Sequence, residues 1–244
     1  MSREFRIEKQ VDLGATPGEV WEAIATEAGQ AAWLWPSPID PSSDVVQAWD
    51  PPRKLVIRLP DAPDGAFQAF EYLIEGRDGA STVLRFVHSG MLERDWSDEY
   101  ESITAGGWDM YLYTLAQYFE HFPGRQAVYI VADGPASSSA PAAWPTLATA
   151  LGLDPSAALG TPVDVSLPGA GAGGVVDYMT AGYIGVRSPD ALIRFHDRSS
   201  LGMAVAVSHH HYDPGLDAAA IQASWATWLA DAFSGRPATP TAHR

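Results

Sequence analysis

Three consecutive histidines, His209, His210 and His211, are the residues of this 244-residue chain whose types most directly suggest chemistry. They lie in the segment AVAVSHHHYDP, which begins with the alternating apolar residues typical of a strand. Neutral imidazole binds zinc, copper or nickel, and it also titrates near neutral pH. The segment could therefore be a metal site, a catalytic base, part of a pocket lining or the polar end of a strand.

The periodicity of the strand separates the three histidines. Successive side chains of a strand point to opposite faces, which predicts that His210 faces outward and that its two neighbours face inward. The predicted inward set is Met203, Val205, Val207, His209 and His211.

A metal site would need a third ligand beside His209 and His211. His196 is expected near the far turn of the hairpin, and at ~3.3 Å per residue it should lie tens of Å away. Asp177 and Asp213 are conceivable ligands, but nothing in their spacing demands it. We therefore expect neither a metal nor a cofactor.

A second inward histidine is predicted in the first half of the chain. In STVLRFVHSG, His88 shares a face with Leu84 and Phe86, and aligning Phe86 with Val207 places His88 opposite His209. Such a histidine is either a polar group at the mouth of a cavity or a structural, half-exposed side chain at a strand end. Ser89 points to the opposite face of the strand, so the pair is not a nucleophile and its base.

No established catalytic motif accompanies these histidines. GAGAGG at 169–174 matches a dinucleotide-binding pattern, but a β-rich, glycine-broken segment follows it instead of a helix, so we interpret it as a loop. Nucleophile-elbow, Walker and H-E-x-x-H motifs are absent from the sequence.

In the first half of the chain, the expected elements are a strand, a helix, four further strands and a long helix. An alternating strand, REFRIEKQVDL, precedes a helix with Thr16 as N-cap, Pro17 at its first position and Glu19 completing a capping box. Four strands are then expected in DVVQAWD, RKLVIRLP, AFQAFEYLIEG and STVLRFVHSG, with Glu71 and Arg85 facing solvent. A helix from about Ser97 to Phe122 closes this half.

The second half is predicted to repeat this order in reduced form. After QAVYIVA and a linker or domain-entry loop, DGPASSSAPAA, come a helix, several strands and a final helix at 217–234 with Asp217 as N-cap. We expect two α+β units, 1–124 and 125–244, the second a reduced copy of the first. Each would pack a long C-terminal helix against an antiparallel sheet.

Composition and charge limit the classes of partner. The hydrophobic content of 46% is ample for a core, and the chain has no Cys to form disulfides or thiolate sites. A net charge of −15 disfavours nucleic acid and anionic membranes as partners. We expect a cytoplasmic protein without a transmembrane helix, whose acidic run ERDWSDEYE at 93–101 is a solvated helix start or a surface for a basic partner.

Residues 4–122 resemble the START-like (SRPBCC, helix-grip) superfamily, and within it the heat-shock-protein-90 ATPase activator-like family. The resemblance is carried by VDLGATPGEVWEAIA, FEYLIEGRDGASTVLRFVHSG and DEYESITAGGWDMYLYTLAQYFE. It implies a curved antiparallel sheet around a long C-terminal helix, with a cavity between them. It implies binding of hydrophobic ligands, cyclase or dehydratase activity, or a chaperone-cofactor role, and no fixed catalytic set.

Aromatic residues fall where they could line such a cavity. The sequence therefore predicts a module that binds a small hydrophobic molecule, more consistent with binding than with catalysis. A chaperone cofactor that binds protein, or a cyclase-type enzyme with His88 or His209 as base, are the alternatives. The candidate cavity residues are Trp33, Trp35, Trp49, Tyr72, Phe86, His88, Trp108, Tyr111, His209 and His211.

Overall fold

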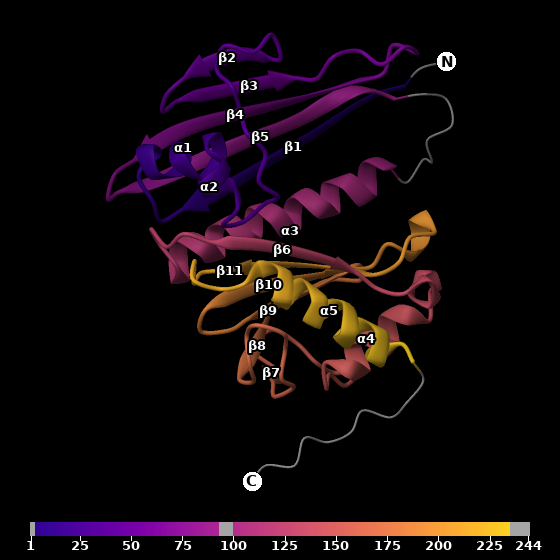
Figure 1. The fold of residues 1–244 in the computed structure, drawn as a ribbon. Helices are drawn as coiled ribbons and strands as arrows, with labels where there is room; N and C mark the ends of the chain where they lie inside the picture. The colour runs from indigo at the N-terminus through magenta and orange to yellow at the C-terminus, as the bar shows by residue number, and fades with distance from the viewer. Residues whose placement is uncertain (1–2, 93–99, 235–244) are drawn as a thin grey trace. The chain divides into compact units, whose positions relative to one another are not determined.

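The structure is a computed structural model that describes residues 3–92 and 100–234 (Figure 1). The chain divides into two compact units, Met1–Gln126 and Ala127–Arg244. Most of the acidic run at 93–101, and the predicted start of the long helix at Ser97, lie outside the described residues. None of the described helices is long and apolar enough to cross a membrane.

The first unit consists of an antiparallel sheet and a long helix that runs along one of its faces (Figure 1). Its described part has five strands in the order β1-β5-β4-β3-β2, so the first strand pairs with the last. The elements are β1 (Arg3–Leu13), α1 (Pro17–Ala25), α2 (Glu27–Gln30), β2 (Val46–Asp50), β3 (Lys54–Arg58), β4 (Phe67–Arg77), β5 (Ser81–Leu92) and α3 (Tyr100–His121). This is the helix-grip α+β arrangement that the resemblance implies.

Local sequence signals determine where α1 begins. The backbone N–H of Glu19 donates to the hydroxyl of Thr16 at 3.3 Å, and a Glu19 carboxylate oxygen accepts from the Thr16 backbone N–H at 2.7 Å. This reciprocal pair is the predicted capping box, with Pro17 at the start of the helix. It holds the apolar face of α1, including Trp21, towards the core.

The two faces of β5 differ as the strand period predicts. Leu84, Phe86 and His88 are buried. On the opposite face Arg85 pairs with Glu75, and on β4 Glu71 pairs with Lys54 across to β3. The inward apolar row therefore faces α3, and the predicted outward positions of Glu71 and Arg85 are confirmed.

In the sheet of the second unit the first strand again pairs with the last, and the longest strands are shorter than those of the first unit. The described part of the second unit forms a six-stranded sheet in the order β6-β11-β10-β9-β8-β7. The elements are β6 (Val128–Asp133), the 3-10 turn η1 (Ala136–Ser139), α4 (Ala143–Ala150), β7 (Pro162–Val163), β8 (Gly174–Met179), β9 (Tyr183–Arg187), β10 (Ala191–His196), the 3-10 turn η2 (Ser199–Leu201), β11 (Ala206–His211) and α5 (Ala218–Ala232).

Because β6 belongs to this sheet, DGPASSSAPAA is a loop inside the unit that contains η1 and leads into α4. The predicted N-cap of the last helix is confirmed, since the Asp217 carboxylate accepts from the Ala220 backbone N–H at 3.1 Å.

Two details of the predicted final hairpin are wrong. Met203 is 46% exposed and precedes β11, because Gly202 turns the chain with φ 67° after η2. His196 lies only three residues from the position on β10 that pairs with His209, about 10 Å by strand geometry rather than tens of Å. His196 instead lies on the opposite face of the sheet from His209. Its Nε2 is hydrogen-bonded at 2.9 Å to the hydroxyl of Ser208, the neighbour of His209 that points outward.

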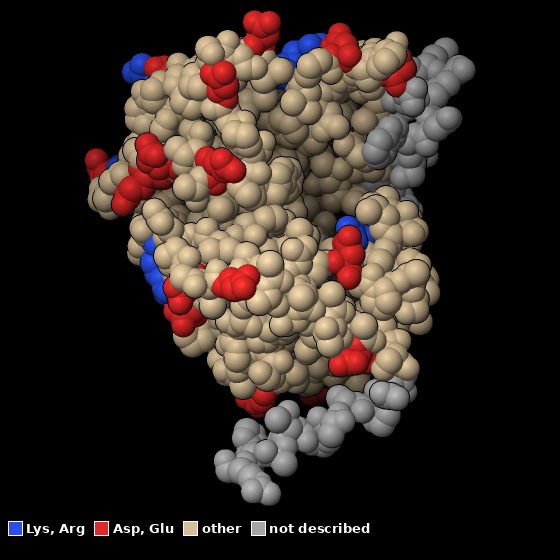
Figure 2. Space-filling view, in the orientation of Figure 1, with Lys and Arg blue, Asp and Glu red and all other residues tan. Residues whose placement is uncertain are grey.

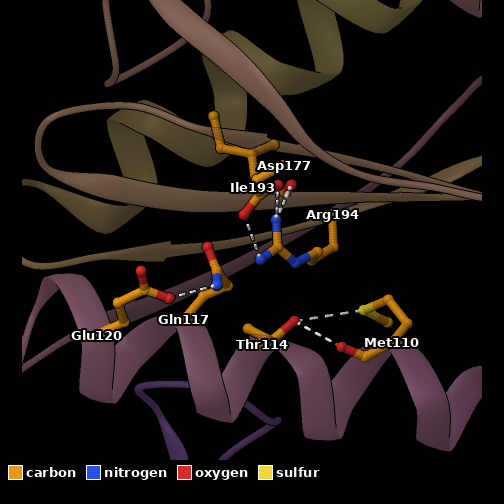
Figure 3. A network of polar contacts seen from close by, with 7 residues as sticks. All are labelled: Met110, Thr114, Gln117, Glu120, Asp177, Ile193 and Arg194. Carbon is orange, nitrogen blue, oxygen red and sulfur yellow. Dashed lines mark hydrogen bonds and ion pairs between the residues drawn. The ribbon is translucent and has the colours of Figure 1, made fainter. Parts of the chain in front are cut away.

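Polar side chains in each unit have hydrogen-bond partners within the same unit, and these include Asp177, which the sequence offered as a conceivable metal ligand (Figure 3). In the second unit, Arg194 on β10 donates to both carboxylate oxygens of Asp177 on β8, at 2.8 and 3.0 Å, so this carboxylate is engaged with a cation rather than free for a metal. On α3, the Thr114 hydroxyl donates to the Met110 carbonyl at 2.8 Å, and Gln117 donates to Glu120 at 3.1 Å.

Candidate functional site

The centre of the first unit is a hydrogen-bonded chain through His88. The indole N–H of Trp108 on α3 lies 3.0 Å from Nδ1 of His88 on β5, and Nε2 of His88 lies 3.1 Å from Oε1 of Gln68 on β4. An indole N–H can only donate, so Nδ1 must be the unprotonated nitrogen. His88 is therefore neutral and donates its Nε2–H to Gln68.

Aromatic rings enclose this imidazole on two sides. The ring of Phe70 stacks on it at 4.5 Å and 22°, and the ring of Phe5 meets it edge-on at 4.9 Å and 89°. Burial in this apolar surrounding lowers the pKa of His88 from 6.5 to about 4, because the charged form loses its hydration. The ring is held neutral and fixed in orientation.

The close packing around His88 requires a glycine at position 90. A Cβ there would lie 2.1 Å from the Phe67 carbonyl oxygen and 2.8 Å from the Phe5 ring. The glycine of the HSG segment thus allows Phe5 to approach the imidazole.

A continuous row of rings leads from His88 towards the surface. Phe86 lies 5.0 Å from Tyr72 and 4.2 Å from Trp108, measured between ring centroids. Trp35 then lies 6.2 Å from Trp108 and 5.2 Å from Tyr111. Trp35 is 43% exposed although Trp108 is buried, so the row runs from the solvent to the core of the unit.

The structure brings together six of the predicted residues of this unit and leaves two elsewhere. The six are Trp35, Tyr72, Phe86, His88, Trp108 and Tyr111. Trp49 instead contacts Trp21 of α1 at 4.9 Å, and the buried Trp33 donates its indole N–H to the Ala23 carbonyl at 2.9 Å. Both tryptophans fix the α1–α2 segment rather than join the row.

Three partners of His88 were missing from the predicted set, namely Phe5, Gln68 and Phe70. Phe70 pairs directly with His88 across β4 and β5, and Gln68 lies two residues from it on the same face. Strand alternation could have placed Gln68 and Phe70 together, but only the pairing register places them against His88.

The same hydrogen bond occurs in the second unit. The indole N–H of Trp225 on α5 lies 3.0 Å from Nδ1 of His209 on β11. His209 pairs with Ile130 on one side and Ile193 on the other. Trp225 was not among the predicted residues, although its place on the last helix matches that of Trp108.

His88 has a corresponding pair of strand neighbours in the first unit. It lies between Ile7 of β1 and Phe70 of β4, as His209 lies between Ile130 of β6 and Ile193 of β10. The proposed alignment of the two histidines therefore agrees with their positions in the two sheets.

The other two histidines of the run have separate surroundings. His211 accepts the backbone N–H of Asp213 at Nδ1, 3.0 Å away, and its Nε2 donates to the carbonyl of Gly169 at 2.9 Å. His210 faces the opposite side of the strand, with its ring 5.2 Å from that of Tyr129. Within residues 3–92 and 100–234, no group of three or more His, Cys, Asp or Glu is arranged to hold a metal.

An open groove of about 580 Å³ lies in the second unit between α5 and the loop before β8. Its lining residues are Ser166, Leu167, Pro168, Gly169, Gly171, Ser224, Thr227, Trp228 and Asp231. The loop that contains GAGAGG thus forms one wall of a groove, and Trp228 supplies an aromatic surface on the other.

Comparison with known proteins identifies part of the chain. The family model described as Activator of Hsp90 ATPase homolog 1-like protein matches residues 10–120. No curated protein matches the chain.

Solved structures with similar folds include Aha1 from Colwellia psychrerythraea, determined as a dimer in solution. It is 19% identical, covers 48% of this chain and 96% of its own, and has a TM-score of 0.39. CalU16 from Micromonospora echinospora is 16% identical, with 49% of this chain and 86% of its own covered and a TM-score of 0.37. DynU16, from the dynemicin biosynthetic locus, is 18% identical, with 94% of this chain and 96% of its own covered and a TM-score of 0.40. The segment 10–120 of this chain, which lies within the first unit, belongs to the Activator of Hsp90 ATPase homolog 1-like family.

Proposed function

We propose that the first unit binds a small, uncharged apolar molecule against the row of rings that begins at Trp35. The observation that carries this proposal is the exposure of Trp35, 43%, next to the buried ring of Trp108. An exposed tryptophan that packs against a buried aromatic row offers apolar area at the surface, held in place by the rings beneath it.

The state of His88 favours binding over catalysis. A general base needs a free lone pair within reach of the proton that it removes. The Nδ1 lone pair of His88 already accepts from Trp108, and Nε2 carries the proton that it donates to Gln68. A cyclase or dehydratase mechanism with His88 as base would first have to break the bond to Trp108, so we place that alternative third, after a protein-binding role.

A neutral fluorescent probe, N-phenyl-1-naphthylamine, tests the binding proposal on the full chain. Titration should give a saturable rise in emission. Trp35→Ala should weaken binding about two- to tenfold, which corresponds to an aromatic contact of about 0.5–1.5 kcal/mol. Trp49→Ala is the matched control, because Trp49 contacts Trp21 and not the row. Emission that never saturates, or equal affinity for the wild type and Trp35→Ala, would refute the proposal.

A protein-binding role as a chaperone cofactor is the second candidate. It is supported by the description of the matching family model and by the net charge of −15. Carboxylates outnumber cationic side chains on the face drawn in Figure 2. This role needs the cytoplasmic location expected from the sequence. A pull-down of the cognate Hsp90-class chaperone that weakens as salt is raised would support it, and no capture at low salt would count against it.

We also propose that the second unit is a reduced copy of the first. The proposal is supported by the matching strand orders, in which the first strand pairs with the last, and by the Trp–His bond between the last strand and the C-terminal helix. Expression of 127–244 alone as a folded, cooperative unit would support it, and an unfolded product would oppose it.

A further inference from the structure

The groove of the second unit contains a single charged side chain, the exposed carboxylate of Asp231. Residues 127–234 contain nine Asp, three Arg and neither Glu nor Lys. Two of the three arginines are already paired with other aspartates, at 2.8 and 2.6 Å. Among the described residues, no ion pair involves Asp231. The groove therefore has a negative charge that the described part of the unit does not neutralise.

The place of Asp231 on its helix adds to this negative potential. α5 ends at Ala232, so the carboxylate lies in the last turn, next to the negative end of the helix dipole. No basic residue lies in the last turn of the described helix. Both the carboxylate and the dipole favour a cation at this end of the groove.

Two hydroxyl groups on the helix wall of the groove can only accept hydrogen bonds from an occupant. Ser224 donates its hydroxyl proton to the Ala220 carbonyl at 2.8 Å, and Thr227 donates to the Ala223 carbonyl at 3.1 Å. A hydroxyl has one proton, so these oxygens offer lone pairs to the groove. This wall therefore suits a positively charged ligand rather than an anion.

Trp228 provides an aromatic surface beside this carboxylate. It lies three residues before Asp231, so the two side chains share one side of α5. Its ring packs on the core of the unit, 5.6 Å from the ring of Trp225 and 6.2 Å from that of Phe195. The accessible part of the indole lines the groove. An aromatic ring attracts a cation, and together with a carboxylate it forms a site suited to organic ammonium groups.

The opposite wall of the groove has a fixed shape and no charge. Leu167 and Gly171 exchange backbone hydrogen bonds at 2.8 and 3.0 Å, and the Gly169 carbonyl accepts from Nε2 of His211 at 2.9 Å. Leu167 and Pro168 supply apolar surface. An ammonium group with N–H donors would lose hydrogen bonds to water against this surface, whereas a fully methylated one would not. The wall therefore favours a quaternary ammonium group.

We propose that the groove between α5 and the loop at 166–171 is a binding site for small quaternary ammonium compounds. The cationic group lies against Trp228 and beside Asp231, and its methyl groups contact Leu167 and Pro168. The site is independent of the row of rings that begins at Trp35, because its ligand is charged and its residues all belong to the second unit.

Choline and its uncharged isostere 3,3-dimethylbutan-1-ol test this site on the full chain, because they differ in charge at nearly constant shape. Choline should shift the indole ¹⁵N–¹H signal of Trp228 saturably in nuclear magnetic resonance spectra, and the loss of that signal in Trp228→Phe assigns it. Choline should bind about two- to thirtyfold more tightly than the alcohol, the range of a cation–π contact. Raising the salt concentration should weaken the binding of choline only.

Two Asp→Asn variants separate a contact with Asp231 from the overall charge of the protein. Asp231→Asn should weaken choline binding about two- to fivefold, the range of an exposed ion pair, without affecting the alcohol. Asp164→Asn removes the same charge at an exposed position outside the lining and should leave choline binding unchanged.

Three results would overturn the proposal: equal affinity for choline and the alcohol, equal effects of the two variants, or a Trp228 signal that choline does not move. Shifts confined to Trp35 and Trp108 would also overturn it, because choline would then bind at the row of the first unit. None of these results decides the titration with N-phenyl-1-naphthylamine, which tests the row separately.

Discussion

The indole N–H of Trp108 and Nδ1 of His88 lie 3.0 Å apart and join the long helix of the first unit to the last strand of its sheet. This bond fixes the tautomer of the imidazole and removes its acceptor from solvent. In the second unit, Trp225 and His209 form the same bond at the same distance. The predictions below begin with the consequences of this bond.

Replacing the donor should change the titration of the histidine. In Trp108→Phe the ring remains but Nδ1 loses the hydrogen bond that favours its neutral form, so the pKa of His88 should rise above its value of about 4. The buried nitrogen left unpaired should lower the free energy of unfolding by about 1–3 kcal/mol. A titration of the His88 ring signals by nuclear magnetic resonance measures the pKa, and Trp49→Phe serves as control. An unchanged His88 pKa would contradict this account.

The stability of the protein should fall as the pH falls below 6.5. Burial lowers the pKa of His88 to about 4 and that of His209 to about 3, both from 6.5, so the unfolded chain binds protons that the folded chain does not. The stability contributed by neutral imidazole is therefore complete above pH 6.5 and is lost as the pH falls towards these folded values.

Denaturant unfolding between pH 7 and pH 5 measures this effect, in a range above the ordinary pKa values of the carboxyl groups. His88 and His209 should each contribute up to about 1.4 kcal/mol per pH unit. His88→Phe should reduce the slope by one histidine's share, while His121→Gln, which leaves His88 and His209 in place, should not. A flat profile in the wild type would show that these histidines are not held neutral by folding.

The capping box of α1 should contribute measurably to stability. Thr16→Ala removes the hydroxyl that accepts from the Glu19 backbone N–H, and we expect a loss of about 1 kcal/mol in the free energy of unfolding. Thr16→Ser keeps the hydroxyl and should retain most of the stability. If the two variants unfold at the same denaturant concentration, the hydroxyl is not the stabilising group.

A methyl group at position 90 should disturb the surroundings of His88. In Gly90→Ala the new Cβ would overlap the Phe67 carbonyl oxygen and the Phe5 ring, so the strand or the ring must move, at a cost of about 1–3 kcal/mol. Ser89→Ala, on the opposite face of β5, should have little effect. Thermal unfolding measures both variants, and a Gly90→Ala protein as stable as the wild type would refute the close packing described here.

Local patterns in the sequence determined much of the fold. Strand alternation placed His88 and His209 on the inward face, and the capping residues Thr16 and Asp217 marked the starts of α1 and α5. These features depend on residues a few positions apart, whose steric and hydrogen-bonding preferences act without the rest of the chain. The family resemblance was also predicted from the sequence alone, over residues 4–122, and the family model matches residues 10–120.

Only the tertiary structure decided which side chains meet. The register of β4 against β5 brings Gln68 and Phe70 to His88, and the packing of α3 and α5 brings a tryptophan to each histidine. The expected burial of Met203 was wrong because the chain turns at Gly202 with a left-handed backbone and β11 begins only at Ala206. The contact of His211 with the Gly169 carbonyl likewise depends on a loop far away in the sequence. Such contacts join residues far apart in the chain, and pairing register and chain closure determine them rather than local periodicity.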